Sequence, residues 1–393
     1  MQPFAIAENI FDVGIIDWTT RDFHGYVTPR GVTYNSYLII DEKICLIDSV
    51  KAPFTDEYIQ KISRVVDPAK IDYVVVNHVE PDHSGALPKL AELAPNAVFY
   101  ITQQGKNEAI QHYGDIFNFA IVKEGDVLSL GKRELQFLPL PMLHWPDSMA
   151  TYLKQDQILF SNDAFGQHYC TSKRFDDEID EAILFFEAQK YFANILSPYA
   201  KLVEKALQKI EGLPLRMIAP SHGAVWRSHI DKIIEKYSCW GAGAKNDTLI
   251  IAYETMWGGT ESVARSVLTG AASAGIPVKL FRLNSSDNSH IVAELLEAGG
   301  VLFGSPTLNY GMMPAMGGLL TYLKGLKPGK KLAAAFGTYG WSGGAQKDME
   351  EFINKAGFDL QPGFNCKWKP QNGEMVEAEK FGYEFAMKIK ENK

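Results

Sequence analysis

Cysteine is scarce in this sequence and never occurs in close pairs. The four cysteines are scattered over 393 residues, at Cys45, Cys170, Cys239 and Cys366. A structural zinc site, a thioredoxin motif or a rubredoxin-type iron module would need C-x-x-C pairs, so the sequence argues against all three. Scattered cysteines are typical of a reduced, cytoplasmic protein, and that is the location we expect.

Long hydrophobic runs and an excess of positive charge are also missing. No stretch approaches the roughly 20 apolar residues of a membrane-spanning helix, so we expect no membrane association. The first residues lack the basic start and apolar core of a signal peptide. The formal net charge is −8, which argues against general nucleic-acid binding. These observations leave a globular protein, and 393 residues are enough for two hydrophobic cores.

What the sequence does contain is a dense group of metal-ligand residues in the segment Asn77–Gly85, N-H-V-E-P-D-H-S-G. The β-branched run before it, Ile71–Val76, predicts a buried strand. The segment after it, Ala86–Leu93, predicts a helix with Ser84 as its N-cap. We interpret this loop as half of a two-metal site. The alternative is a polar loop whose histidines only bond to the backbone.

The spacing within this loop favours ligands that converge. His78 and Glu80 are two residues apart, so an extended backbone directs both side chains the same way. Asp82 and His83 are adjacent and diverge, unless the chain turns and lets them serve a second metal. Such a cluster of polar groups is costly inside a protein unless something neutralises it.

Three further ligand-type residues follow predicted strands elsewhere in the chain. His144 lies after the run Leu135–Leu140, Asp163 closes the strand in Q-I-L-F-S-N-D, and His222 follows Met217–Ala219. Taken alone, a histidine after a strand is more often an ordinary polar residue than a ligand, and Asp163 is also consistent with a turn or N-cap residue. Because strand ends of one sheet meet at one rim, their recurrence favours a single site.

Two domains are expected. Residues 1–244 mix short strands with helices and predict an α+β sandwich. A small, polar segment, G-A-G-A-K-N-D, marks a linker. Residues 245–393 alternate strands and helices, with a last strand at Phe358–Phe364, which predicts a doubly wound parallel sheet.

Three loops of the second domain follow strands and combine glycine, hydroxyl and aromatic residues. The first opens a helix whose N-terminal amides suit a phosphate, and it lacks the lysine of a nucleotide-triphosphate loop, which favours FMN. A turn with a core aromatic is the alternative for each loop. The expected flavin contacts are Thr255, Met256, Trp257, Gly258, Gly259 and Thr260; Ser305, Pro306, Thr307, Leu308 and Asn309; and Gly337, Thr338, Tyr339, Gly340, Trp341, Ser342 and Gly343.

Over essentially its whole length the chain resembles the flavodiiron proteins. The resemblance is carried by the motifs H-V-E-P-D-H, L-H-W-P-D-S, S-N-D-A-F-G, P-S-H-G, T-M-W-G-G-T-E, G-S-P-T-L-N and G-T-Y-G-W-S-G-G. It implies a metallo-β-lactamase-like αββα sandwich with two irons, followed by a flavodoxin-like FMN domain. Zinc hydrolases of this fold usually carry histidine at the position of Glu80, and a carboxylate there favours iron.

The resemblance also implies the roles of individual residues. His78, Glu80, His144 and Asp163 would bind one iron, and Asp82, His83, His222 and Asp163 the other, with Asp163 bridging. Residues that resemble the family's pocket-lining positions are His24, Tyr26 and Tyr191, and more weakly His168. His24 would donate a proton or a hydrogen bond to a bound diatomic molecule.

The family's chemistry is reduction of dioxygen to water or of nitric oxide to nitrous oxide. Electrons would come from rubredoxin or a reduced deazaflavin. The implied assembly is a head-to-tail homodimer or a dimer of dimers. The motifs do not distinguish the two gases, the donor or the assembly, nor whether His83 binds iron in every state. Two other functions fit less well: a zinc hydrolase fused to a flavodoxin domain, and an electron carrier whose first domain is a dimerisation scaffold.

Overall fold

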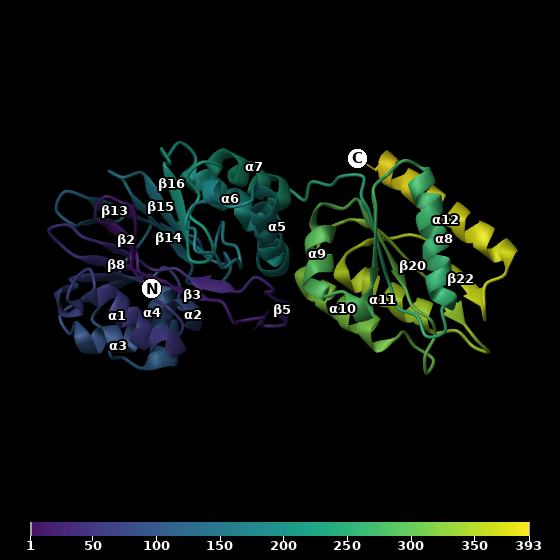
Figure 1. Cartoon of the computed structure of the whole chain (residues 1–393), viewed down its shortest axis with the longest axis horizontal. Helices are drawn as coiled ribbons and strands as arrows, with labels where there is room; N and C mark the ends of the chain where they lie inside the picture. Colours follow the sequence, from purple (N-terminus) through teal and green to yellow (C-terminus); the bar gives the residue numbers. More distant parts are fainter. Residues whose placement is uncertain (1, 393) are drawn as a thin grey trace. The chain divides into compact units, whose positions relative to one another are not determined.

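The computed structural model describes residues 2–392, and its chain forms two compact units (Figure 1). The first unit runs to Tyr191 and includes Lys201–Ser238, while the second combines Phe192–Ala200 with the chain from Cys239 onward. The boundary that we placed between residues 244 and 245 stays a prediction. Within the described residues, no helix is both long and apolar enough to cross a bilayer.

Two sheets form the centre of the first unit. Within the described residues one has seven strands in the order β1-β2-β7-β8-β9-β10-β11, and the other has five in the order β12-β13-β14-β15-β16. The strands of the first sheet are β1 (Phe4–Ala7), β2 (Ile10–Asp12), β7 (Tyr37–Ile39), β8 (Cys45–Ile47), β9 (Tyr73–Val75), β10 (Val98–Ile101) and β11 (Phe119–Ile121). Those of the second are β12 (Val127–Ser129), β13 (Glu134–Pro139), β14 (Met149–Leu153), β15 (Ile158–Asn162) and β16 (Met217–Pro220). Two small hairpin-like pairs join β3 (Ile15–Asp17) to β6 (Val32–Tyr34) and β4 (Asp22–Phe23) to β5 (Tyr26–Val27).

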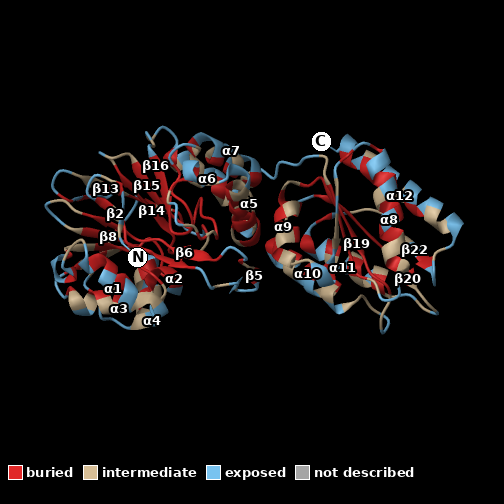
Figure 2. Cartoon of the chain, in the orientation of Figure 1, coloured by how far each residue is buried: buried red, intermediate tan, exposed pale blue. Residues whose placement is uncertain are grey.

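Helices cover the outer faces of both sheets, which gives a four-layer sandwich. They are α1 (Thr55–Ser63), α2 (Pro81–Ser84), α3 (Leu87–Leu93), α4 (Gln103–Tyr113), α5 (Glu181–Tyr191), α6 (Ala200–Ile210) and α7 (Ile230–Gly241). Successive residues of β9 show the layering, because Val74 packs in the core beneath the helices and Val75 in the core between the sheets. Figure 2 shows these strands almost entirely buried, while the helices expose one side. The predicted α+β sandwich is confirmed.

The start of the helix after the histidine-rich loop differs from our expectation. Ser84 is not the N-cap of this helix, because it ends the one-turn helix α2, and α3 begins at Leu87. The hydroxyl of Ser84 instead donates to the carbonyls of Val79 and Glu80, at 2.7 and 3.0 Å. Pro81 explains the difference, since proline at a first helical position favours a helical turn there.

The second unit is a doubly wound parallel sheet. Its strand order is β18-β17-β19-β20-β21, with β22 also pairing with β20, and all pairings are parallel. The strands are β17 (Leu249–Tyr253), β18 (Val278–Arg282), β19 (Gly300–Gly304), β20 (Leu332–Tyr339), β21 (Asp359–Leu360) and β22 (Phe364–Lys367). The helices are α8 (Gly259–Ser273), α9 (Asn288–Glu297), α10 (Pro314–Leu326), α11 (Ala345–Ala356) and α12 (Asn372–Glu391).

This order places the crossover between β17 and β19, where open α/β sheets bind ligands at the carboxyl ends of their strands. The last strand differs from the predicted Phe358–Phe364. It is divided into β21 and β22, and the interruption contains Pro362 and Gly363, which are poor strand residues.

Candidate metal centre and cofactor pocket

One group of candidate ligands forms where three strands end. His78 and Glu80 follow β9, His144 follows β13, and Asp163 directly follows β15. Glu80 Oε2 lies 3.2 Å from His78 Nε2 and 3.1 Å from His144 Nε2. Asp163 Oδ2 lies 3.2 Å from His144 Nε2 and 3.7 Å from His78 Nε2. These atoms all lie within 4.8 Å of one another, as the ligands of one metal ion do.

A second group lies on the other side of Asp163. His83 Nε2 is 3.4 Å from Asp82 Oδ1, and His222 Nε2 is 3.3 Å from Asp82 Oδ2. Asp163 Oδ1 lies 3.0 Å from His83 Nε2 and 3.5 Å from His222 Nε2. The single turn of α2 directs Asp82 and His83 to the same side. Asp163 therefore presents one oxygen to each group, which is the geometry of a bridging carboxylate.

The burial and the unsatisfied polar atoms of these residues fit a pair of metal ions. Within the described residues, both oxygens of Asp82 and of Asp163 and both nitrogens of His83 are buried without a well-formed hydrogen bond. Unpaired buried polar atoms are costly, and a cation removes that cost. Imidazole and carboxylate together, with no thiolate, suit iron or another first-row metal.

The buried carboxylates strengthen the proton affinity of the histidines beside them. Burial lowers the pKa of His83, but the charges of Asp82 and Asp163 outweigh it and raise the pKa to about 9. Burial likewise opposes protonation of His144, yet the neighbouring carboxylates Asp163 and Glu80 raise its pKa to about 9. Burial would raise the pKa of Asp163, but the adjacent histidines hold it well below its ordinary value. The site attracts positive charge strongly.

Residues outside the two groups orient the imidazoles. His78 Nδ1 lies 2.9 and 3.0 Å from the carboxylate oxygens of Asp147. His222 Nδ1 donates to the carbonyl of Thr33 at 2.6 Å. Such partners fix the ring so that Nε2 faces the metal. We did not predict Asp147, although it stands three residues after His144 in the motif L-H-W-P-D-S.

The predicted pocket residues lie at different distances from the centre. His24 forms the tip of the β4–β5 hairpin, is 76% exposed, and has its Nε2 3.5 Å from Glu80 Oε1. Tyr191 is buried with its ring centroid 5.8 Å from that of His222. The ring centroid of His168 lies 5.0 Å from that of Tyr26 and 5.0 Å from that of His222. Burial, reinforced by the charge of His222, lowers the pKa of His168 well below its ordinary value and keeps this ring neutral.

A second site lies at the carboxyl ends of the parallel strands of the second unit. It is a pocket of about 560 Å³ lined by Thr255, Met256, Trp257, Gly259, Pro306, Thr307, Leu308, Asn309, Tyr310, Thr338, Tyr339, Gly340, Trp341, Ser342, Trp368 and Lys369. The volume suits a cofactor with a planar ring. The exposed indoles of Trp257 and Trp341 lie at its edge, and the N-terminus of α8 offers free amides for a phosphate.

Five predicted residues do not line this pocket: Gly258, Thr260, Ser305, Gly337 and Gly343. Three of them, Thr260, Ser305 and Gly337, contact the residues that support the pocket loops. The Thr260 hydroxyl is hydrogen-bonded to that of Thr338 at 2.8 Å, and Ser305 accepts a bond from the amide of Met313 at 2.9 Å. A Cβ on Gly337 would lie 2.0 Å from the carbonyl oxygen of Ser305.

The lining residues that we missed are Tyr310, Trp368 and Lys369. Trp368 and Lys369 directly follow β22, at a fourth strand end. Placing the last strand three residues too early hid that loop. Its position after a β-rich run, F-N-C-K, was the available signal.

Comparisons with known proteins agree with this geometry. Residues 32–223 match the family model described as ODP family beta lactamase, and residues 251–382 match that of flavodoxin. A nitric oxide reductase of Moorella thermoacetica is 46% identical over 99% of both chains. The structure of the flavodiiron protein from Giardia intestinalis superposes with a TM-score of 0.97, at 35% identity, over 100% of this chain and 97% of that one.

The chain belongs to the flavodiiron protein family. The rubredoxin oxygen:oxidoreductase of Desulfovibrio gigas is similar over 99% of both chains, with a TM-score of 0.96 and 38% identity. The predicted β-lactamase-like and flavodoxin-like folds are confirmed, and the protein is an oxidoreductase. Family membership implies iron and FMN, which the two sites described above are able to hold.

Proposed function

We propose that the protein reduces dioxygen to water, nitric oxide to nitrous oxide, or both, at a centre with two irons in each chain. The observation that carries this proposal is the position of Asp163. It stands between two groups that each contain two histidines and a further carboxylate. Two sites that combine imidazole with carboxylate and share one carboxylate suit two iron ions that act together on one substrate.

Iron would supply electrons and open coordination positions, and FMN would supply further electrons. The chain's own residues hold and surround the reacting molecule. His78, Glu80 and His144 hold one position and Asp82, His83 and His222 the other, with Asp163 between them. The exposed imidazole of His24 beside Glu80 is placed to deliver a proton from solvent. Tyr191 and Tyr26 both pack against the ring of His168.

The pocket of the second unit would hold FMN. The helix α8 amides, together with Thr255, would bind its phosphate, and aromatic residues of the other loops would flank the ring. We propose an external electron donor, either rubredoxin or a reduced deazaflavin. The relative from Desulfovibrio gigas carries rubredoxin in its name, which supports the first.

We further propose a head-to-tail homodimer or a dimer of dimers in the cytoplasm. The described cysteines are all free thiols, which agrees with a reduced compartment. Neither the assembly nor the compartment alters the roles of the ligand residues. The gas preference between dioxygen and nitric oxide depends on the residues around the centre rather than on the ligands themselves.

The first experiment measures the metal and flavin content of the purified protein. About two irons and one FMN per chain are expected, followed by anaerobic assays in which the reduced protein consumes dioxygen or nitric oxide. Zinc in place of iron, with FMN still bound, would instead support the hydrolase with an attached flavodoxin domain. The carboxylate of Glu80 in the ligand set argues against that second function.

A further inference from the structure

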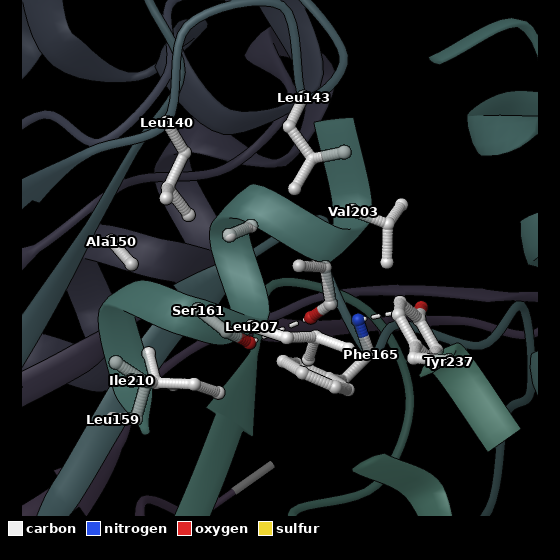
Figure 3. A pocket seen from close by; sticks show the side chains of 12 residues that line it. Leu140, Leu143, Ala150, Leu159, Ser161, Phe165, Val203, Leu207, Ile210 and Tyr237 are labelled. Atoms are coloured by element: carbon white, nitrogen blue, oxygen red, sulfur yellow. Dashed lines mark hydrogen bonds between the residues drawn. The ribbon is translucent and has the colours of Figure 1, made fainter. Parts of the chain in front are cut away.

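An apolar cavity lies on the outer face of the second sheet of the first unit, beneath helix α6 (Figure 3). Residues of β14 and β15 form its floor, α6 forms its roof, and Leu143, Phe165 and Tyr237 close its sides. Its volume is about 20 Å³, counted as the space open to the centre of a water molecule. Since about 10–15 Å³ on this measure admits one water, the cavity has room for a single small molecule.

Strand and helix periodicity explain why this space is apolar. Phe160 of β15 points into the core between the sheets, so its neighbour Leu159 points outward to the cavity. On α6, Val203, Leu207 and Ile210 recur at helical spacing and cover the same space. Ala150, the second residue of β14, has a small side chain that leaves the volume unfilled.

The few polar atoms in the walls already have partners. Ser161 donates its hydroxyl hydrogen to the carbonyl of Ala164 at 2.6 Å. The hydroxyl oxygen of Tyr237 accepts the amide of Phe165 at 2.6 Å. A water inside the cavity would therefore lack the two to four hydrogen bonds that hold buried water, and such apolar cavities stay dry and take apolar guests.

Three residues of the cavity wall lie next to candidate metal ligands in the sequence. Leu143 directly precedes His144, and Ala164 and Phe165 directly follow Asp163. Phe165 has a φ of 66°, which is rare for a bulky residue. Two hydrogen bonds hold this backbone conformation. The Phe165 amide donates to the Tyr237 hydroxyl, and the Trp226 indole donates to the Phe165 carbonyl at 2.8 Å. The same turn thus positions a metal ligand and a wall of the cavity.

We propose that this cavity binds a small apolar diatomic gas close to the metal centre and raises the local concentration of that gas. The identity of the gas as dioxygen or nitric oxide rests on the proposed function. Both molecules are small enough for the space, carry almost no dipole, and leave water for apolar surroundings. A dry cavity whose walls include the sequence neighbours of His144 and Asp163 would hold such a molecule beside the turns that carry these two candidate ligands.

Xenon tests the binding site directly, because it enters apolar cavities and needs no redox chemistry. Crystals of the protein with its metal and FMN are pressurised with xenon, and a peak is expected between Leu143, Phe165 and Leu207. Ala150→Val fills the space from the sheet and Ala206→Leu fills it from the helix, so both should lose the peak. Ala200→Leu, on the same helix but outside the lining, should keep it.

A second measurement follows the gas itself. In stopped-flow mixing of the reduced protein with limiting nitric oxide or dioxygen, the filled variants should capture gas several-fold more slowly. Metal content, FMN content and the rate at saturating gas should remain those of the unaltered protein, as should all values for Ala200→Leu. Two independent fillings guard against a variant that fails to fold.

Three results would overturn the proposal: no xenon in the unaltered protein, an ordered water in the cavity, or unchanged capture rates in both filled variants. Failure of the proposed function gives a different result. A protein that consumes neither gas would contradict the reductase, while the xenon map would still decide whether the cavity takes an apolar guest.

Discussion

The imidazole of His78 is held from behind by Asp147, whose two carboxylate oxygens lie 2.9 and 3.0 Å from His78 Nδ1. The second oxygen also accepts the amide of Val79 at 2.8 Å. Asp147 therefore fixes both the ring and the backbone that follows it. This contact leaves Nε2 of His78 directed at Glu80 and Asp163.

Replacing Asp147 with alanine should weaken metal binding without removing a ligand. Loss of such an outer partner typically lowers metal affinity about 10–100-fold, because the ring loses its orientation and basicity. Competition with a chromophoric chelator measures the affinity. Glu92→Ala, which removes an exposed carboxylate on α3, is the control and should leave it unchanged. Equal affinities in both variants would contradict the role of Asp147.

Asp163→Ala should empty both metal positions, whereas Glu80→Ala should mainly affect one. The reason is geometric, since Asp163 faces His144 with one oxygen and His83 with the other. Metal analysis per chain should fall from about two to near zero in the first variant and to about one in the second. FMN content should stay the same in both. An Asp163→Ala protein that retains two metal ions would exclude the bridging arrangement.

Gly337→Ala should abolish or strongly weaken FMN binding, and Gly343→Ala should not. A Cβ at Gly337 would lie 2.0 Å from the carbonyl oxygen of Ser305, while one at Gly343 meets nothing within 4 Å. The added methyl group would separate two of the loops that form the pocket. Quenching of FMN fluorescence on titration with the flavin-free protein measures the affinity. Similar values for the two variants would show that the close approach of these loops is unimportant.

The free energy of unfolding of the second unit should increase as the pH rises from about 8 to 10.5, because the pKa of Lys331 is lowered in the folded protein. Burial lowers the pKa of Lys331 to about 8, while its ammonium donates to the carbonyls of Leu296 and Ala298 at 2.9 and 3.0 Å. The unfolded chain binds more protons than the folded chain across this interval, so the free energy of unfolding increases with pH. Below it both states are protonated and the dependence disappears.

The magnitude for Lys331 is about 3 kcal/mol, because each pKa unit corresponds to about 1.4 kcal/mol. Denaturation of the full chain with and without Lys331→Met, at several pH values, measures it. The variant should lack this rise, so its stability relative to the unaltered protein should decline between pH 8 and 10.5. A constant difference would show that Lys331 has an ordinary pKa in the folded protein.

The meeting of the candidate ligands was predictable from the strands that precede them, while their role as metal ligands stays a prediction. Strand runs before His78, His144, Asp163 and His222 fixed their common location, since strand ends meet at one rim of a sheet. The separation into two groups was implied by the family resemblance and not by local sequence patterns. It depends on the turn that Pro81 starts, which brings Asp82 and His83 to one side, and the sequence suggests such a turn without fixing its direction.

Contacts between distant segments were not predictable from local patterns. The role of Asp147 requires the loop after β13 to fold back onto the loop after β9, which is a tertiary relation. Trp368 was missed because Pro362 and Gly363 interrupt the last strand, so its true end lies beyond the expected one. The cavity beneath α6 depends on small differences in side-chain volume, as at Ala150, and periodicity does not report volumes.

The distribution of the ligands along the chain has a consequence for how the protein is assembled. The candidate ligands begin at His78 and end at His222, so metal binding joins loops from both sheets of the sandwich. Metal-binding free energy then becomes free energy of folding for this whole unit, because an unfolded chain cannot gather these loops. All of them also precede the flavodoxin-like residues 251–382. A nascent chain can therefore complete its metal centre, and be locked into shape by it, while the flavin-binding part is still being synthesised.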